Sequence, residues 1–130
     1  MQLMISTEQP LEEKELLLRA IRPANKKPDF WKGNRLSSAA FKDPKGLSVS
    51  RVFDRPLSEA VGWMKSNFQG PIFSVTVLNC LNVHAHLVNK PSPFVPYHYE
   101  IHGGENTVVL SDEQALYLAR AAKNAEEISL

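Results

Sequence analysis

Two stretches of the chain carry apolar residues at intervals of three and four, the spacing that places them on one helix face. The first predicts a helix over about 57–69, which ends at Gly70. The second predicts a helix over about 111–124, and Ser111 and Gln114 at its start have the spacing of a capping box. These are the two main helices that we expect.

Shorter segments rich in β-branched residues predict strands. Strands are expected at 72–78, 83–88, 97–101 and 107–110, and a hairpin is expected over 39–49 around a turn at 43–46. The segment 16–21 is either a buried strand or part of an N-terminal helix. Because the helices and strands are segregated rather than alternating, we predict a single compact α+β domain over residues 1–130, with a mainly antiparallel sheet.

Charge and composition exclude several classes of protein. The chain has 130 residues, and 15 Lys and Arg against 14 Asp and Glu leave a net charge of +1, so long nucleic acid is an unlikely partner. No apolar run reaches the roughly 18 residues that a membrane span needs, and the N-terminus lacks the features of a signal peptide. We therefore expect a cytoplasmic protein without a membrane partner.

Histidines and one glutamate follow strand-like spacing in two places. His98, Glu100 and His102 would share one face of a strand, and so would His84 and His86. If the two strands were adjacent, His84, His86, His98 and His102 could converge on zinc or iron. Alternatively, these residues form the polar, solvent-facing side of an antiparallel sheet.

Small hydroxyl and basic side chains are concentrated between residues 35 and 51. Guanidinium, ammonium and hydroxyl groups are the donors that a phosphate-bearing ligand requires. The candidate anion contacts are Arg35, Ser37, Ser38, Lys42, Ser48 and Arg51. The segment has no phosphate-loop motif, and a charged turn with serine-capped ends explains the same residues.

The segments RLSSAAFKDPKGLSVSR and PYHYEIHG, with SVTVLNC and LSDEQALYLARAAK, resemble a group of small uncharacterised bacterial proteins. The similar region extends from about Leu17 to Lys123. The resemblance implies a bacterial, cytoplasmic setting, and the segment around His98 and Glu100 is among its distinguishing polar features. His84 and His86 lie outside the similar segments, which disfavours a four-ligand metal site.

A more distant similarity is to ADP-ribosyl-transfer folds. Those folds place an arginine on an early strand, a serine on a central strand and a later glutamate around a nicotinamide dinucleotide. Arg19 or Arg22, Ser37 or Ser38, and Glu100 occur in that order here. The similarity is an analogy of fold and residue order.

Two isolated side chains have alternative interpretations. Cys80 is either a small buried apolar residue or a nucleophile activated by His84 or His86. Trp63 lies just off the main helical stripe, which suits the edge of the core or a surface that contacts a partner.

The sequence leaves three functions open. In the first, the protein binds or processes a nucleotide or nucleic-acid phosphate, with His98 and Glu100 as the catalytic acid–base pair. In the second, it is a non-catalytic interaction module, a partner of a toxin or defence system, which uses a sheet edge and the aromatic loop at Phe30 and Trp31. The third is a histidine-based metal protein. The expected partner is thus a small anionic ligand or another protein, and the sequence implies no particular cofactor.

Overall fold

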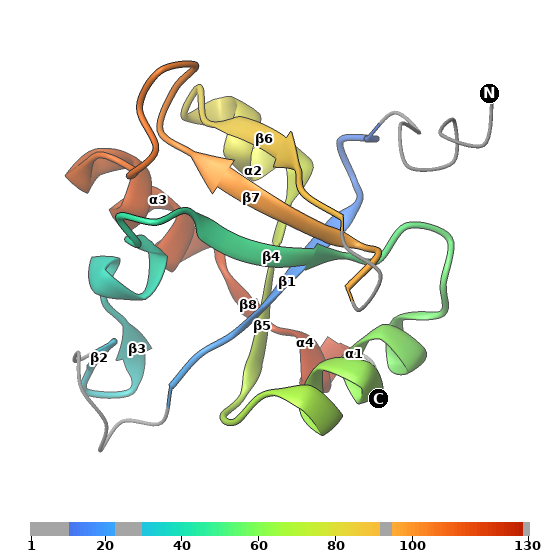
Figure 1. The fold of residues 1–130 in the computed structure, drawn as a ribbon. Coiled ribbons are helices and arrows are strands. Elements are labelled where there is room, and N and C mark those ends of the chain that lie inside the picture. The colour runs from blue at the N-terminus through green and yellow to red at the C-terminus, as the bar shows by residue number, and fades with distance from the viewer. Residues whose placement is uncertain (1–10, 23–29, 92–94, 129–130) are drawn as a thin grey trace, which may run out of the picture.

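The computed structural model describes residues 11–22, 30–91 and 95–128 (Figure 1). In chain order, its elements are β1 (Leu16–Ala20), β2 (Trp31–Lys32), β3 (Arg35–Leu36), the 3₁₀ helix η2 (Ser38–Phe41), β4 (Leu47–Arg51), α1 (Leu57–Asn67), β5 (Ile72–Thr76), α2 (Val77–Asn82), β6 (His86–Asn89), β7 (His98–His102), α3 (Asp112–Ala121), β8 (Lys123–Asn124) and α4 (Ala125–Ile128). Among the residues described, no helix has both the length and the apolar character that crossing a membrane requires.

The main structural element is a six-stranded antiparallel sheet with the strand order β6-β7-β4-β1-β5-β8. The strands β2 and β3 form a separate small hairpin. Four α-helices accompany these sheets in the described part of the chain. The protein therefore has a compact α+β fold, as the segregation of helices and strands predicts.

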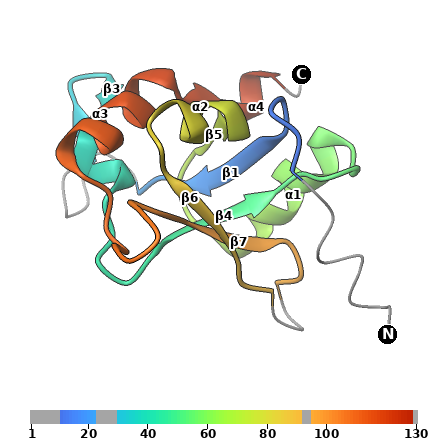
Figure 2. The same ribbon diagram turned by 90° about the horizontal axis from the view of Figure 1, so that it is seen from above.

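Helices pack on both faces of the central strand β1, which is why both faces carry a buried leucine. Leu17 belongs to the core cluster that contains Cys80 of α2 and Leu118 of α3. Its neighbour Leu18 belongs to the other cluster, with Met64 of α1 and Ala125 of α4. Figure 2 shows α2 and α3 on one side of the sheet, away from α1. The apolar run at residues 16–21 is thus a strand buried on both faces.

Both main helices form where the periodicity predicts them, and the capping box of α3 is confirmed. The hydroxyl of Ser111 accepts from the backbone N–H of Gln114 at 3.1 Å, and the Gln114 side chain accepts from the backbone N–H of Ser111 at 2.8 Å. The amide of Gln114 also donates to the carbonyls of Val83 and Gly103. One side chain therefore both starts α3 and ties it to two loops.

A second capping box makes the strand predicted at 72–78 end earlier than expected. The Thr76 hydroxyl accepts from the backbone N–H of Asn79 at 3.0 Å, and the Asn79 side chain accepts from the N–H of Thr76 at 2.8 Å. The chain then turns into α2, which buries Val77 and Cys80. Apolar periodicity alone does not separate a strand from a buried helical turn over so few residues.

The strand predicted at 83–88 is displaced, because α2 occupies the residues before it. His84 has φ +59°, a left-handed turn that follows α2. The strand β6 therefore begins only at His86. The prediction that His84 and His86 share a strand face is wrong.

Two further predicted elements are also wrong. The segment 107–110 makes only an isolated bridge, between Thr107 and Gly104, and only its last residue, Leu110, is buried. The hairpin predicted over 39–49 is absent, because the chain before the turn coils into η2 and buries Ala40 and Phe41 against the core. Only the second arm of that hairpin, β4, is a strand.

The capping geometry predicts the effect of replacing Ser111. Ser111→Ala should lower the free energy of unfolding by about 1 kcal/mol, because the N-cap loses its acceptor for the first-turn amide. Urea unfolding followed by circular dichroism measures the change. Ser66→Ala is the matched control, since Ser66 is exposed within α1 and should change stability by less than about 0.5 kcal/mol. An unaltered midpoint for Ser111→Ala would contradict this account of the helix start.

Candidate ligand-binding site

A cavity of about 320 Å³ lies between α1 and the sheet. This volume falls within the range of about 300–1,000 Å³ that is usual for small-molecule sites. Its charged and polar lining residues are Arg19, Ser48, Ser50, Arg55, Glu59 and His98. They come from β1, β4, the turn before α1, α1 itself and β7, so the cavity exists only in the folded chain.

The sheet presents a polar face to this cavity because β7 alternates strictly. Tyr99 and Ile101 are buried in the core, whereas His98, Glu100 and His102 are half-buried on the opposite face. The predicted placement of these three polar side chains on one face is therefore confirmed.

The antiparallel register brings serines of β4 beside these polar residues. Ser50 pairs with His98, and Ser48 pairs with Glu100. Both serines face away from Val49, which is buried in the core on the other side. Of the predicted site residues, Ser48 and His98 line the cavity together.

His98 is held by a hydrogen bond at each ring nitrogen. Its Nδ1 lies 2.9 Å from the backbone carbonyl of Lys90, and its Nε2 lies 3.1 Å from the Ser48 hydroxyl oxygen. A carbonyl oxygen can only accept, so Nδ1 carries the proton. In the neutral ring Nε2 is then the acceptor, and the hydroxyl of Ser48 donates to it.

Arg19 brings a positive charge from the centre of the sheet to the cavity. The pairing of β1 with β4 is confined to Leu17 and Leu18, and beyond it the Arg19 guanidinium bridges the two strands. It donates to the carbonyl of Ser48 at 3.1 Å and to the carbonyl of Ala40 at 2.9 Å. Burial lowers the pKa of Arg19 to about 10, which still leaves it protonated at neutral pH.

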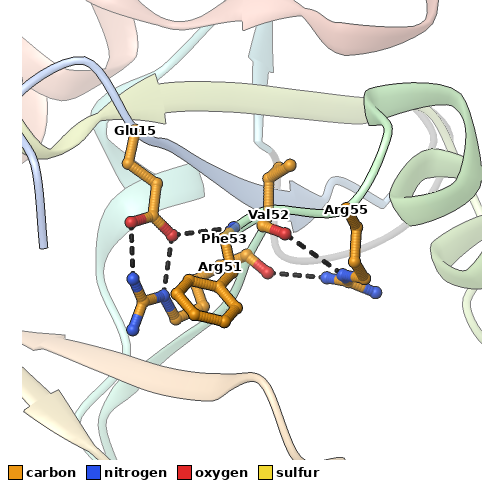
Figure 3. A network of polar contacts seen from close by, with 5 residues as sticks. All are labelled: Glu15, Arg51, Val52, Phe53 and Arg55. Atoms are coloured by element: carbon orange, nitrogen blue, oxygen red, sulfur yellow. Dashed lines mark hydrogen bonds and ion pairs between the residues drawn. The ribbon is translucent and has the colours of Figure 1, made fainter. Parts of the chain in front are cut away.

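The turn between β4 and α1 is organised by a buried ion pair (Figure 3). The Glu15 carboxylate accepts from Nε and Nη2 of Arg51, each at 2.7 Å, and from the backbone N–H of Phe53 at 2.9 Å. The side chains of Arg51 and Glu15 are only 5% and 8% exposed. Burial lowers the pKa of Arg51, but the hydrogen bonds and negative charge of Glu15, together with Tyr99, outweigh this and raise it.

Aromatic rings complete the enclosure of Arg51. Its guanidinium carbon lies 4.4 Å from the ring centroid of Phe53 and 5.6 Å from that of Tyr99. Phe53 has φ +59°, a left-handed conformation that costs a bulky residue on the order of 1–2 kcal/mol. The ring contact and the hydrogen bond to Glu15 offset that cost. A second cavity borders Arg51, but Glu15 already neutralises this arginine.

The same turn directs Arg55 to the first cavity. Its guanidinium donates to the carbonyl of Arg51 at 2.6 Å and to that of Val52 at 3.2 Å, as Figure 3 shows. Its carbon lies 3.8 Å from the ring centroid of Tyr97, a cation–π contact. Burial lowers the pKa of Arg55, and the charges of Tyr97 and Glu59 oppose this.

Aromatic and apolar side chains form the remaining wall of the cavity. Trp63 and Phe68 of the α1 region meet edge to face, with centroids 6.0 Å apart and planes at 69°. Phe68 is 46% exposed, so part of its ring is open to solvent. Val95 and Pro96 also line the cavity. The site thus has a cationic and hydroxyl-bearing side and an aromatic side.

The other predicted anion contacts lie away from this cavity. Arg35 is exposed on β3, Ser37 precedes η2, and Ser38 begins it. Lys42 forms an ion pair with Asp112 at the start of α3. The hydrogen bond and positive charge of Lys42 lower the pKa of the Asp112 carboxyl. None of these lines the cavity. Arg51 faces the opposite side of β4 from Ser48 and is bound by Glu15.

Glu100 is directed to a different histidine from the one predicted. Its carboxylate lies 2.8 Å from Nε2 of His102, whereas His98 is oriented by a backbone carbonyl. Gly46 permits this position, since a Cβ there would lie 2.3 Å from the Glu100 carboxylate. The predicted pairing of His98 with Glu100 as acid and base is replaced by a His98–Ser48 contact.

The four histidines of the metal hypothesis do not converge. His86 pairs with His102 across β6 and β7, but His84 is in the turn before β6. His98 is four residues before His102 on β7, and its ring nitrogens contact Ser48 and the Lys90 carbonyl. Within the described residues, no group of three or more His, Cys, Asp and Glu side chains could hold a metal ion.

Cys80 and the aromatic loop belong to the core. Cys80 is 0% exposed, and burial raises its pKa to about 12. Phe30 is buried, and Trp31 packs edge to face on Phe73 with its indole N–H donating to the carbonyl of Arg22. Phe30 and Trp31 therefore pack inward rather than form an exposed aromatic anchor.

No sequence pattern indicated Arg55 as a site residue, and only the distant fold analogy pointed to Arg19. A detectable signal exists for Arg19, because it is a charged residue inside an apolar run that forms a strand buried on both faces. Arg55 carries no comparable signal, since its position depends on the turn at 51–55.

The buried ion pair predicts a large effect of removing Glu15. Glu15→Ala should lower the free energy of unfolding by about 3–5 kcal/mol, because it leaves the buried Arg51 charge without a counter-ion. Equilibrium urea unfolding measures the loss. Glu12→Ala is the control, since Glu12 is exposed on the same segment. A loss below about 1 kcal/mol would show that the pair does not organise this turn.

The environment of Cys80 predicts a thiol that does not react in the folded protein. With a pKa of about 12 and no exposed surface, Cys80 should resist iodoacetamide at pH 8. In urea the same thiol should alkylate fully, which intact-mass measurement shows. Rapid alkylation of the native protein would restore Cys80 as a candidate nucleophile.

Comparison with models of protein families, with curated proteins and with solved structures finds no match to this chain. The resemblance to small bacterial proteins and the analogy with ADP-ribosyl-transfer folds therefore stay predictions.

Proposed function

We propose that the cavity binds a small ligand that combines an anionic group with a flat apolar group, and that this ligand is a mononucleotide. The observation that carries the proposal is that two buried or half-buried arginines and an aromatic wall line one cavity of about 320 Å³. Each side of the cavity matches one part of such a ligand.

Arg19 and Arg55 would bind the anionic group of the ligand. Their backbone contacts fix both guanidinium groups before any ligand arrives, so little conformational entropy is lost on binding. Glu59 contributes one negative charge at the rim, which leaves the cavity with a net positive charge from these three side chains. Hydroxyl and imidazole groups of Ser48 and His98 supply directional hydrogen bonds.

Trp63 and Phe68 would stack on the flat group of the ligand. Bases stack on aromatic side chains with about 1–3 kcal/mol per base, and the exposed part of Phe68 leaves surface for such a contact. The size of the cavity and the net charge of +1 favour a mononucleotide over a long nucleic acid. The proposal keeps the predicted ligand class and relocates the site.

A thermal-shift panel tests this proposal. AMP, GMP, CMP and UMP should be compared with ribose 5-phosphate and inorganic phosphate, and at least one mononucleotide should raise the melting temperature more than either fragment. Trp63→Leu should weaken its binding about tenfold through lost stacking. Glu59→Gln should tighten it about twofold at low salt, because a repelling charge is removed.

Arg35→Ala is the matched control for these variants. Arg35 is an exposed arginine on β3 and does not line the cavity, so its loss should leave nucleotide binding unchanged. A panel without any shift would overturn the proposal. A shift that depends on Arg35 but not on Trp63 or Glu59 would return the site to the 35–51 segment.

A further inference from the structure

The Ser48–His98 contact has the geometry of a nucleophile and its base. The serine hydroxyl lies 3.1 Å from Nε2 of the imidazole, within reach for proton transfer. Ser48 is exposed although its neighbours Leu47 and Val49 are buried, so its hydroxyl is accessible from the cavity. The two side chains come from adjacent strands, and rigid elements rather than loops therefore fix their separation.

The backbone carbonyl of Lys90 completes the arrangement. It accepts from Nδ1 of His98 at 2.9 Å and so selects the tautomer whose Nε2 can take a proton from Ser48. In serine hydrolases a carboxylate commonly has this orienting role. Here the nearest carboxylate on β7, Glu100, is engaged with His102 instead.

Two arginines of the cavity lie close to Ser48 in the fold, where positive charge would favour an oxyanion. The Arg19 guanidinium donates to the carbonyl of Ser48 itself, so it is fixed beside the serine backbone. Arg55 lines the same cavity and approaches the hydroxyl of the neighbouring Ser50 at 3.5 Å. Preorganised donors and charges of this kind stabilise the transition state of acyl transfer.

We infer that Ser48 is the nucleophile and His98 the general base in the hydrolysis of a small carboxylic ester bound in this cavity. The inference rests on the proposed function, because it takes the anionic, flat ligand as one part of the ester. It assigns to Ser48 a covalent role in place of the anion contact predicted from the sequence.

The reaction balances with water as the only co-reactant. Oγ of Ser48 attacks the carbonyl carbon while its proton passes to Nε2 of His98. The ester C–O bond then breaks, and the leaving alkoxide takes that proton, which leaves an acyl-serine. Water attacks the acyl-serine and gives a proton to His98, which returns it to Oγ of Ser48 as the carboxylic acid departs.

An alkyl fluorophosphonate tests the nucleophile directly, since the serine oxygen displaces fluoride at phosphorus as its proton passes to the base. The folded protein should be labelled at Ser48. Trypsin releases the peptide 46–51, which contains both Ser48 and Ser50, and fragmentation of this peptide locates the label. Ser50 is an internal control, because it faces the same cavity and Arg55 rather than the imidazole nitrogen approaches its hydroxyl.

Variants and pH separate the inference from general reactivity. Ser48→Ala should abolish labelling, and His98→Gln should slow it at least about 100-fold, while Ser66→Ala on α1 should leave it unchanged. In the unaltered protein the rate should fall in acid, because a protonated imidazole cannot accept the serine proton. This pH dependence keeps the inference testable even if His98→Gln does not fold.

The outcomes distinguish this inference from the proposed function. Suppose that a mononucleotide raises the melting temperature but Ser48 is not labelled, or Ser50 is labelled equally. The assignment of Ser48 as the nucleophile is then wrong, and the proposed binding site is retained. Suppose instead that labelling of Ser48 depends on His98 but no nucleotide raises the melting temperature. The assignment of Ser48 as the nucleophile is then supported, and the proposal of a mononucleotide ligand is wrong.

Discussion

The buried ion pair between Glu15 and Arg51 is the constraint on which the site depends. It joins the end of β4 to the segment that precedes β1. The same carboxylate accepts a hydrogen bond from the backbone N–H of Phe53, and this bond fixes the following turn. That turn presents the Arg51 and Val52 carbonyls to Arg55 and starts α1 two residues later. Since a buried charge without its partner is strongly destabilising, this arrangement tolerates neither partner alone.

A second constraint is the strict alternation of the outer strands. The strand β1 buries a leucine on each face because helices cover both, but β7 lies toward the edge and keeps one polar face. The helix α1 covers part of that polar side and encloses a cavity there. Polar side chains that would otherwise face solvent on an antiparallel sheet therefore line a partly enclosed site, where electrostatic contacts are stronger than in water.

Within that site, hydrogen bonds to the backbone position the functional groups. The Lys90 carbonyl orients His98, and backbone carbonyls hold the guanidinium groups of Arg19 and Arg55. Backbone acceptors are fixed by the sheet and the turn, so the side chains are preorganised without a network of charged partners. This distinguishes them from Lys42, whose partner Asp112 is an exposed side chain.

The sequence by itself determined the α+β class, the two main helices, the Ser111 capping box and the shared face of His98, Glu100 and His102. Each of these depends on local spacing or on a nearby hydrogen bond, so a few residues of sequence suffice. Only the tertiary structure decided that Ser48 meets His98, that Glu100 turns to His102 and that Arg19 and Arg55 reach one cavity. Those contacts depend on strand register, on the course of a turn and on which helix covers which face, and all three are fixed by packing between segments distant in the chain.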